Sequence, residues 1–272
     1  MAPLRRVPAR RLLRPVAGTG LHVSLLDGQR SVLFVHAHPD DETISTGALI
    51  AEFVALGSRV FLLTCSRGER GEVVDGPLTA LAGTEELARE RDQELERATG
   101  ILGITERFWL GEPPARVDGL ARRRYRDSGM VWIRPGQAGP ADDAAADALS
   151  VAPLAEVTDD VAALIVRLRP SLVVSYDDGG GYGHPDHVRA HYAARAASAA
   201  TGTAFAEVLE APADGGEWFD LPQHLTVVTD ALRAHASQLT VYGTEIVHSG
   251  GQREAIGTSA GLRLWPVSAS SA

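Results

Sequence analysis

Two short stretches of the sequence place histidines and carboxylates close together: HAHPDDE (36–42) and GYGHPDH (181–187). Each follows an apolar segment, SVLFV (31–35) or SLVVSY (171–176), which is typical of a buried strand. Two imidazoles, a carboxylate and an open fourth position form the usual catalytic zinc site. One HPD alone could simply begin a helix, because proline and acidic residues suit a first helical turn. Two copies, each placed after a strand, favour a metal site.

The first motif holds more carboxylates than metal binding needs. Asp40 and Asp41 are adjacent, so they cannot both point at one ion from a regular helical turn. One can bind the metal while the other acts as general base on a metal-bound water. The chain has a single cysteine, Cys65, which excludes an internal disulfide and a cysteine-rich zinc site. Cys65 follows a predicted strand, and we expect it to be a small buried residue.

Apolar segments alternate with segments of helical spacing along most of the chain. The predicted strands are 31–37, 59–65, 107–111, 171–176 and 204–211, and the predicted helices are 42–57, 84–103, 157–170, 184–200 and 228–239. This alternation predicts an α/β, Rossmann-like three-layer fold with a mostly parallel sheet and helices on both faces. In such sheets ligands bind beyond the carboxyl ends of the strands, where both HPD motifs fall.

The predicted organisation is one domain with two flanking segments. We expect an Arg-rich N-terminal extension over 1–30, a single catalytic domain over 31–243 and an irregular Gly/Ser-rich tail over 244–272. Residues 112–155 interrupt the alternation and are predicted to form a loop, the first half of which we expect to be functional. The sequence leaves open the roles of the extension and of the Ala/Asp-rich segment 135–150.

Composition excludes several classes of function. The net charge of −9 argues against a general nucleic-acid binder and against a protein of anionic membranes. The chain contains no lysine, which excludes Schiff-base chemistry and a Walker phosphate-binding loop. No apolar run approaches the ~20 residues that span a membrane, and the N-terminus lacks the apolar core of a signal peptide. We therefore expect a cytoplasmic enzyme with a small-molecule substrate, and a homo-oligomer stays open.

The two motifs together resemble the LmbE/PIG-L family of zinc-dependent N-acetylglucosamine deacetylases. The resemblance extends from about Ser31 to about Ala200. GGYGHPDH (180–187) and RYRDSGM (124–130) are most similar to the branch that deacetylates the GlcNAc-inositol precursor of mycothiol, and RGERGE (67–72) is similar to the related mycothiol-conjugate amidase. The resemblance implies a zinc site, and carboxylate and imidazole ligands would also suit iron.

The family's functional positions can be carried over to this chain. The resemblance implies that the metal ligands are His38, Asp41 and His187, that the catalytic residues are Asp40, His184, Asp186 and Tyr182, and that the sugar-contacting residues are Glu72, Arg91, Asp127 and Met130. Asp40 would activate the metal-bound water as general base. His184 would polarise or protonate at the reaction centre, with Asp186 orienting it. Tyr182 would help to stabilise the oxyanion.

The implied reaction is removal of the N-acetyl group from a GlcNAc-containing small molecule similar to GlcNAc-inositol. One alternative is an amidase or deacylase of another conjugate, such as a mycothiol S-conjugate, a glycosylated antibiotic or a glycolipid. A metallophosphoesterase is a weaker alternative, because it usually needs two metals. A non-catalytic sugar- or metal-binding domain is the alternative from a different class, and the presence of Asp40 argues against it.

Four further residues have two readings each. Glu42 either complements the dipole of a helix or orders the site. His36 either supports a ligand or packs in the core. His191 lies four residues after His187 on the same helical face, so it could bind metal, although three ligands already exist. His235 is either an ordinary surface residue of a helix or a residue near the active site, as the resemblance implies.

Overall fold

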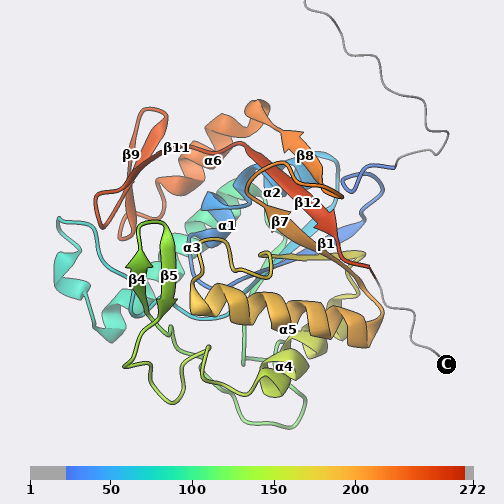
Figure 1. Cartoon of the computed structure of the whole chain (residues 1–272), viewed down its shortest axis with the longest axis horizontal. Helices are drawn as coiled ribbons and strands as arrows, with labels where there is room; N and C mark the ends of the chain where they lie inside the picture. The colour runs from blue at the N-terminus through green and yellow to red at the C-terminus, as the bar shows by residue number, and fades with distance from the viewer. Residues whose placement is uncertain (1–22, 267–272) are drawn as a thin grey trace, which may run out of the picture.

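Five of the predicted strands form the parallel part of one seven-stranded sheet (Figure 1). The computed structural model describes residues 23–266. In spatial order the strands are β3 (Glu106–Trp109), β2 (Arg59–Thr64), β1 (Ser31–His36), β6 (Leu172–Ser175), β7 (Ala204–Leu209), β12 (Ser259–Leu264) and β8 (Glu217–Asp220). β12 pairs antiparallel with both β7 and β8, and the other pairs are parallel.

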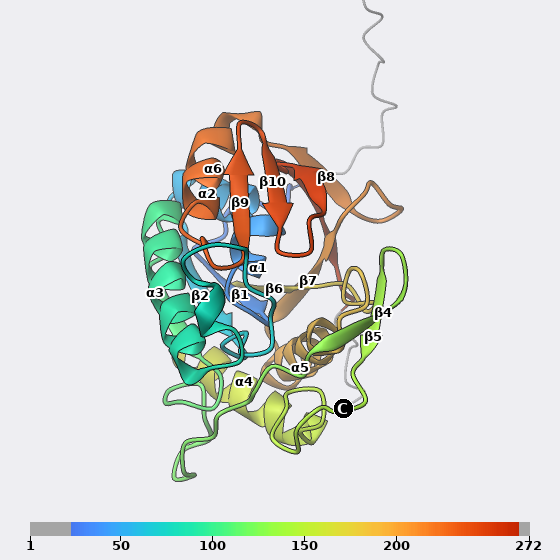
Figure 2. The same cartoon turned by 90° about the vertical axis from the view of Figure 1, so that its left-hand side faces the viewer.

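Helices cover both faces of this sheet (Figure 2), which confirms the predicted α/β three-layer fold. The helices are α1 (Asp41–Ile44), α2 (Gly47–Ala55), α3 (Glu85–Leu102), α4 (Leu154–Leu168), α5 (Pro185–Thr201) and α6 (Leu225–Leu232), with short 3₁₀ turns η1 (Thr79–Leu81) and η2 (Pro222–His224). Successive residues of β1 point to opposite faces. Val32 and Phe34 pack with α2, α3 and α6, whereas Leu33 and Val35 pack with α4 and α5. No helix in residues 23–266 has the length and apolarity to cross a membrane.

The prediction of an irregular tail is wrong for residues 244–266, and residues 267–272 lie outside the described residues. Three strands form a small antiparallel sheet, β9 (Leu239–Tyr242), β10 (Glu245–His248) and β11 (Arg253–Ala255), and β12 then enters the main sheet. The small residues have a packing role in β12. A Cβ on Gly261 would lie 3.1 Å from both Leu209 and Trp218, so the packing of these two side chains leaves little room for a side chain at this position. The domain therefore includes residues well beyond 243.

Three other features differ from the prediction. The segment 112–155 contains a hairpin, β4 (Met130–Arg134) and β5 (Gln137–Pro140), rather than loop alone. The predicted helix 42–57 is divided into α1 and α2, because the backbone leaves the helical conformation at Thr46. At the N-terminal side Leu26 is buried in the main core, so the domain begins before residue 31. Residues 1–22, most of the predicted extension, lie outside the described residues.

Two leucines of β12 test whether this strand is part of the core. Leu262 is fully buried, whereas Leu264 is 47% exposed on the same strand. We expect Leu262→Ala to lower the free energy of unfolding by about 2–5 kcal/mol, because it leaves a cavity in a packed interior. Leu264→Ala should change it by less than about 1 kcal/mol. Chemical denaturation of both variants measures the difference, and equal effects would contradict the burial of β12.

Candidate active site

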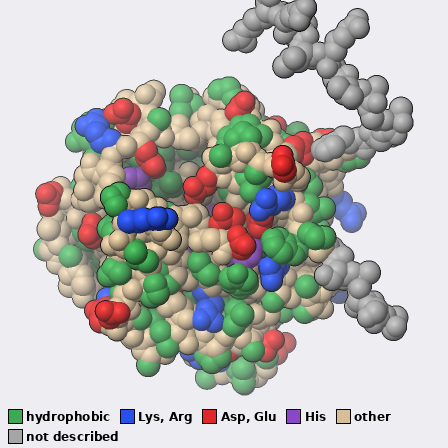
Figure 3. Space-filling view, viewed as in Figure 1, with side chains coloured by type: hydrophobic (Ala, Val, Ile, Leu, Met, Phe, Trp, Pro, Cys, Tyr) green, Lys and Arg blue, Asp and Glu red, His purple; other side chains and the backbone are tan. Residues whose placement is uncertain are grey.

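The two HPD motifs meet at the point where the strand order reverses. From β1 the chain continues to β2, which pairs with one edge of β1, while β6 pairs with the other edge of β1. This arrangement opens a crevice beyond the carboxyl ends of β1 and β6, the usual ligand site of an open α/β sheet. The first motif follows β1 and the second follows β6 at the start of α5. In the space-filling view of this face, acidic side chains and a histidine gather near the middle (Figure 3).

The first motif forms a tight loop with an unusual backbone at Asp40. Its φ of 104° lies in the left-handed region, which costs a non-glycine residue roughly 1–3 kcal/mol. The loop persists because it is anchored at several points. The Asp40 carbonyl accepts the N–H groups of Thr43 and Ile44 at 2.9 Å, and its N–H donates to Glu42 Oε2 at 3.0 Å. The positive φ of Asp40 therefore belongs to a loop that is held by hydrogen bonds to both the N–H and the carbonyl of this residue.

Asp41 lies at the centre of the site. Its Oδ2 accepts the backbone N–H of His38 at 2.8 Å and the hydroxyl of Tyr176 at 2.7 Å. Oδ2 lies 3.3 Å from His38 Nδ1, and Oδ1 lies 3.3 Å from His187 Nε2. Burial alone would raise the pKa of the Asp41 carboxyl, but His187 and His38 hold this pKa well below its ordinary value. Asp41 is therefore an ionised buried carboxylate between two imidazoles.

The donor set of His38, Asp41 and His187 fits a metal ion. His187 Nε2 is buried and has no hydrogen-bond partner among the described residues, which is costly for a polar atom unless something binds it. Ring nitrogens of His38, His184 and His187 also lie within 4.8 Å of one another. Two imidazoles and one carboxylate with room beside them suit zinc or iron. The geometry thus brings together the three predicted ligands, with His184 adjacent to them.

Asp186 does not have the role expected for it. Its carboxylate lies 3.2 Å from His38 Nε2 and accepts the backbone N–H and the hydroxyl of Ser128, the former at 2.9 Å. Only its backbone N–H reaches His184, at Nδ1 and 3.1 Å. The reason is positional, because His184 precedes α5 as its N-cap while the Asp186 side chain turns back toward β1. Asp186 therefore orients the candidate metal ligand His38, as supporting carboxylates commonly do.

His184 and Tyr182 lie on the second motif beside the candidate metal ligands. Since His184 Nδ1 accepts a backbone N–H, a neutral ring must carry its proton on Nε2. Burial, together with His38 and His187, lowers the pKa of His184 to about 2, so this neutral form is favoured. The Tyr182 ring is 38% exposed, and its centroid lies 5.2 Å from that of His187.

Asp40 is the remaining acid of the site. No hydrogen bond within residues 23–266 uses its side-chain carboxylate, which is partly exposed. Burial and then the neighbouring charge of Asp41 raise the pKa of Asp40 to about 7. A carboxylate with a pKa near neutrality is suited to take up and release a proton. Two adjacent acids thus have opposite pKa shifts, which is typical of a catalytic pair with divided roles.

The four residues predicted to contact the sugar differ in their burial and in their contacts. Arg91 is only 2% exposed and donates to the carbonyls of Gly68 and Glu72, the latter at 2.9 Å. It therefore shapes the loop 68–72 from inside rather than offering its guanidinium to a ligand. Asp127 is buried, and its Oδ1 lies 3.7 Å from His38 Nε2. Met130 is partly exposed, and Glu72 is exposed, with its Oε2 3.2 Å from the hydroxyl of Ser249.

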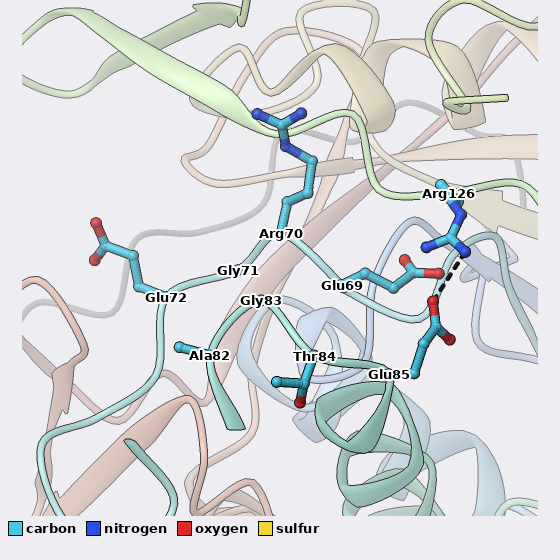
Figure 4. Close-up of a pocket in the computed structure, with 9 residues that line it drawn as sticks. All are labelled: Glu69, Arg70, Gly71, Glu72, Ala82, Gly83, Thr84, Glu85 and Arg126. Atoms are coloured by element: carbon cyan, nitrogen blue, oxygen red, sulfur yellow. Dashed lines mark hydrogen bonds and ion pairs between the residues drawn. The ribbon is translucent and has the colours of Figure 1, made fainter. Parts of the chain in front are cut away.

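A cavity of about 460 Å³ lies beside the loop that Arg91 supports (Figure 4). It is lined by Glu69, Arg70, Gly71, Glu72, Ala82, Gly83, Thr84, Glu85 and Arg126. Most of its charges are already paired, for example Arg126 with Glu85 at 2.9 Å. Glu69 links the cavity to the site, because it accepts the backbone N–H of Asp127 at 3.1 Å. The cavity adjoins the catalytic cluster and does not contain it.

Sequence reasoning missed two residues that hold the site together. Tyr176 donates to Asp41, and its ring stacks on His187 at 4.1 Å. Ser128 bonds to Asp186 through both its N–H and its hydroxyl. The end of the strand SLVVSY could have indicated Tyr176, because it occupies the carboxyl end of β6. Nothing local in the sequence distinguishes Ser128.

The structure also decides between the two readings of several histidines. His36 is buried in the core and lies 2.9 Å from the hydroxyl of Thr46. His191 is buried, and its Nδ1 lies 2.7 Å from the carbonyl of Tyr176, outside the groups that could hold metal in the described chain. His235 is fully buried against Glu42 and is no surface residue. Cys65 is buried, as predicted, which raises its pKa.

Comparison with known proteins identifies the family of this chain. Residues 33–198 match the PIG-L family, described as GlcNAc-PI de-N-acetylase. A 1D-myo-inositol 2-acetamido-2-deoxy-α-D-glucopyranoside deacetylase of Kineococcus radiotolerans is 47% identical over 168 residues, 62% of this chain and 44% of that protein. The protein of the same name from Kribbella flavida is 38% identical over 226 residues, 81% of this chain and 70% of that protein.

A solved structure shows the same fold. N,N′-diacetylchitobiose deacetylase from Pyrococcus horikoshii matches with a TM-score of 0.56 and 21% identity, over 77% of this chain and 71% of that one. The fold and site thus define an α/β protein with a histidine and carboxylate centre able to hold a metal. The chain belongs to the PIG-L family. It spans less than half the length of the Kineococcus relative.

Two histidines of α5 test the candidate metal ligands. We expect wild-type protein to bind about one divalent ion per chain. His187→Gln should lose this ion, because it removes the unpaired Nε2. His191→Gln is the matched control, four residues along the same helix, and should keep it. The metal content of each variant is measured by mass spectrometry after dialysis. Metal retained by His187→Gln, or metal lost by His191→Gln, would contradict the assignment of the ligands.

Proposed function

We propose that this protein is a zinc-dependent N-deacetylase that removes acetyl from a GlcNAc-containing small molecule of the GlcNAc-inositol type. The observation that carries the proposal is the pairing of an unbonded acid, Asp40, with the donor set of His38, Asp41 and His187 at the switch point of the sheet. Relatives named as deacetylases of a GlcNAc-inositol compound support the substrate class. Iron in place of zinc would suit the same ligands.

Each residue of the site has a defined task in amide hydrolysis. His38, Asp41 and His187 would hold the metal, which when bound supplies a Lewis acid and lowers the pKa of water. Asp40 takes the proton of the attacking water and returns a proton to the departing amine nitrogen. The Nε2–H of His184 and the hydroxyl of Tyr182 donate to the acetamide oxygen as charge develops on it. Asp186 keeps His38 oriented.

The substrate is proposed to be a small acetamido sugar in the cytoplasm. Glu72, Asp127 and Met130 are proposed to contact the sugar, whereas Arg91 acts through the loop that it holds. The cavity beside this loop has room for a polar group attached to the sugar. An amidase of another conjugate would use the same chemistry with a different attached group.

Replacing the proposed base tests the mechanism. Asp40→Asn keeps the shape of the side chain but cannot accept a proton, so kcat should fall by about 10²–10⁴-fold. Metal content should be unchanged, because Asp40 is not a proposed ligand. Asp214→Asn, an exposed acid on a surface loop, serves as control and should keep full activity. Unchanged turnover in Asp40→Asn would exclude Asp40 as the base.

Release of a primary amine tests the substrate class. Purified protein is offered GlcNAc, GlcNAc-inositol and a GlcNAc-bearing glycopeptide, each with and without a chelator. We expect chelator-sensitive release, fastest from GlcNAc-inositol. Preference for the glycopeptide would assign the chain to another branch of deacetylases. No release from any acetamido sugar, in protein that holds its metal, would exclude the proposed reaction.

A further inference from the structure

The strained loop of Asp40 is held by a residue from a distant part of the chain. Glu42 Oε2 accepts the Asp40 N–H at 3.0 Å, and Glu42 Oε1 lies 2.8 Å from His235 Nε2. Both Glu42 and His235 are fully buried. A buried carboxylate needs a partner that donates to it, and removal of that partner is strongly unfavourable. Glu42 Oε1 also accepts the hydroxyl of Thr43 at 2.5 Å, but His235 is the partner that can carry a compensating positive charge. Loss of His235 would therefore weaken the hold on the Glu42 carboxylate where it receives the Asp40 N–H.

The turn that carries His235 is itself fixed. It follows α6, and the next residues bond to a buried acid of α3: Glu94 accepts the N–H of Ser237 at 2.6 Å and its hydroxyl at 2.7 Å. The Ser237 carbonyl accepts the N–H of Val74 at 2.9 Å. Gln238 Nε2 lies 3.4 Å from His235 Nδ1, on the far side of the ring. The imidazole thus has one position, with Nε2 directed at Glu42.

The metal site does not depend on this pair in the same way. Asp41, next to Asp40, has its own anchors in the backbone N–H of His38 and the hydroxyl of Tyr176. Asp40 has no comparable bond on its side-chain carboxylate within residues 23–266, so its direction follows its backbone alone. Loss of the Glu42–His235 pair would let φ of Asp40 relax to a negative value and turn the carboxylate away, while the ligands stay in place.

The geometry points to His235 and Glu42 as positioning residues that aim the catalytic acid Asp40, so that the segment after residue 198 completes the active site. The match to the PIG-L family ends at residue 198, and His235 comes from beyond it. This inference rests on the proposed function for its kinetic part only, because the backbone conformation of Asp40 can be measured without turnover.

The test uses the full chain with metal bound and compares His235→Ala with His235→Gln. In His235→Ala we expect kcat to fall on the order of 10–100-fold with KM and metal content unchanged, the usual effect of removing a supporting partner. His235→Gln should recover part of the loss, because its amide N–H can still donate to Glu42. Full activity in His235→Ala would overturn the inference, and so would loss of metal together with activity.

A matched control separates positioning from general stability. His224 lies 2.6 Å from Glu52 Oε2 and forms a second histidine–glutamate pair, at the start of α6 and away from the catalytic loop. His224→Gln should lower the melting temperature without changing kcat. If His235→Ala fails to fold, Glu42→Gln replaces it, because it keeps the shape of the side chain while removing its charge. An equal fall in kcat in His224→Gln would overturn the inference.

Hydrogen exchange of the Asp40 amide gives a readout that needs no activity. In the wild type this N–H donates to a buried carboxylate, so its exchange should be slow. In His235→Ala its exchange should approach that of an unprotected amide, while the His38 amide, bonded to Asp41, stays protected. Protection of Asp40 that survives in His235→Ala would overturn the inference even if the protein hydrolysed no acetamido sugar.

Discussion

The rest of the site depends on the contacts that the buried carboxylate of Asp41 makes with its neighbours. One oxygen receives the His38 N–H and the Tyr176 hydroxyl, and the other faces His187. These partners come from the loop after β1, from the end of β6 and from the start of α5. The two halves of the sheet are thus joined at one buried ionised group, which costs free energy unless every partner is in place.

Burial of charge has a second effect at the same place. Asp41 is kept ionised by its two imidazoles, and its charge together with burial raises the pKa of Asp40. In the proposed function one acid is therefore a fixed ligand and the other a group that exchanges a proton, although they are neighbours in the chain. The two acids also differ in their surroundings, because the Asp41 carboxylate accepts two hydrogen bonds, whereas the Asp40 carboxylate accepts none within residues 23–266.

Much of the fold and of the site was predictable from the sequence for identifiable reasons. The strands before both motifs are continuous apolar runs, as expected of strands buried on both faces. The position of each motif after a strand predicted that His38, Asp41 and His187 would lie at one edge of the sheet, and the structure brings these side chains close together. The prediction was wrong for residues 244–266, because β12 has a glycine where close packing against its neighbours leaves no room for a Cβ, and composition cannot distinguish this from a loop.

The sequence by itself determined the chemistry: which side chains can bind a metal, which acids are in excess, and that both motifs follow buried strands. Only the tertiary structure decided which groups these side chains contact. Asp186 bonds to His38 rather than His184, Arg91 supports a loop from within, and His235 reaches Glu42 across 193 positions of the chain. These contacts depend on how distant segments pack and not on local periodicity or propensity, so no pattern within either segment specifies them.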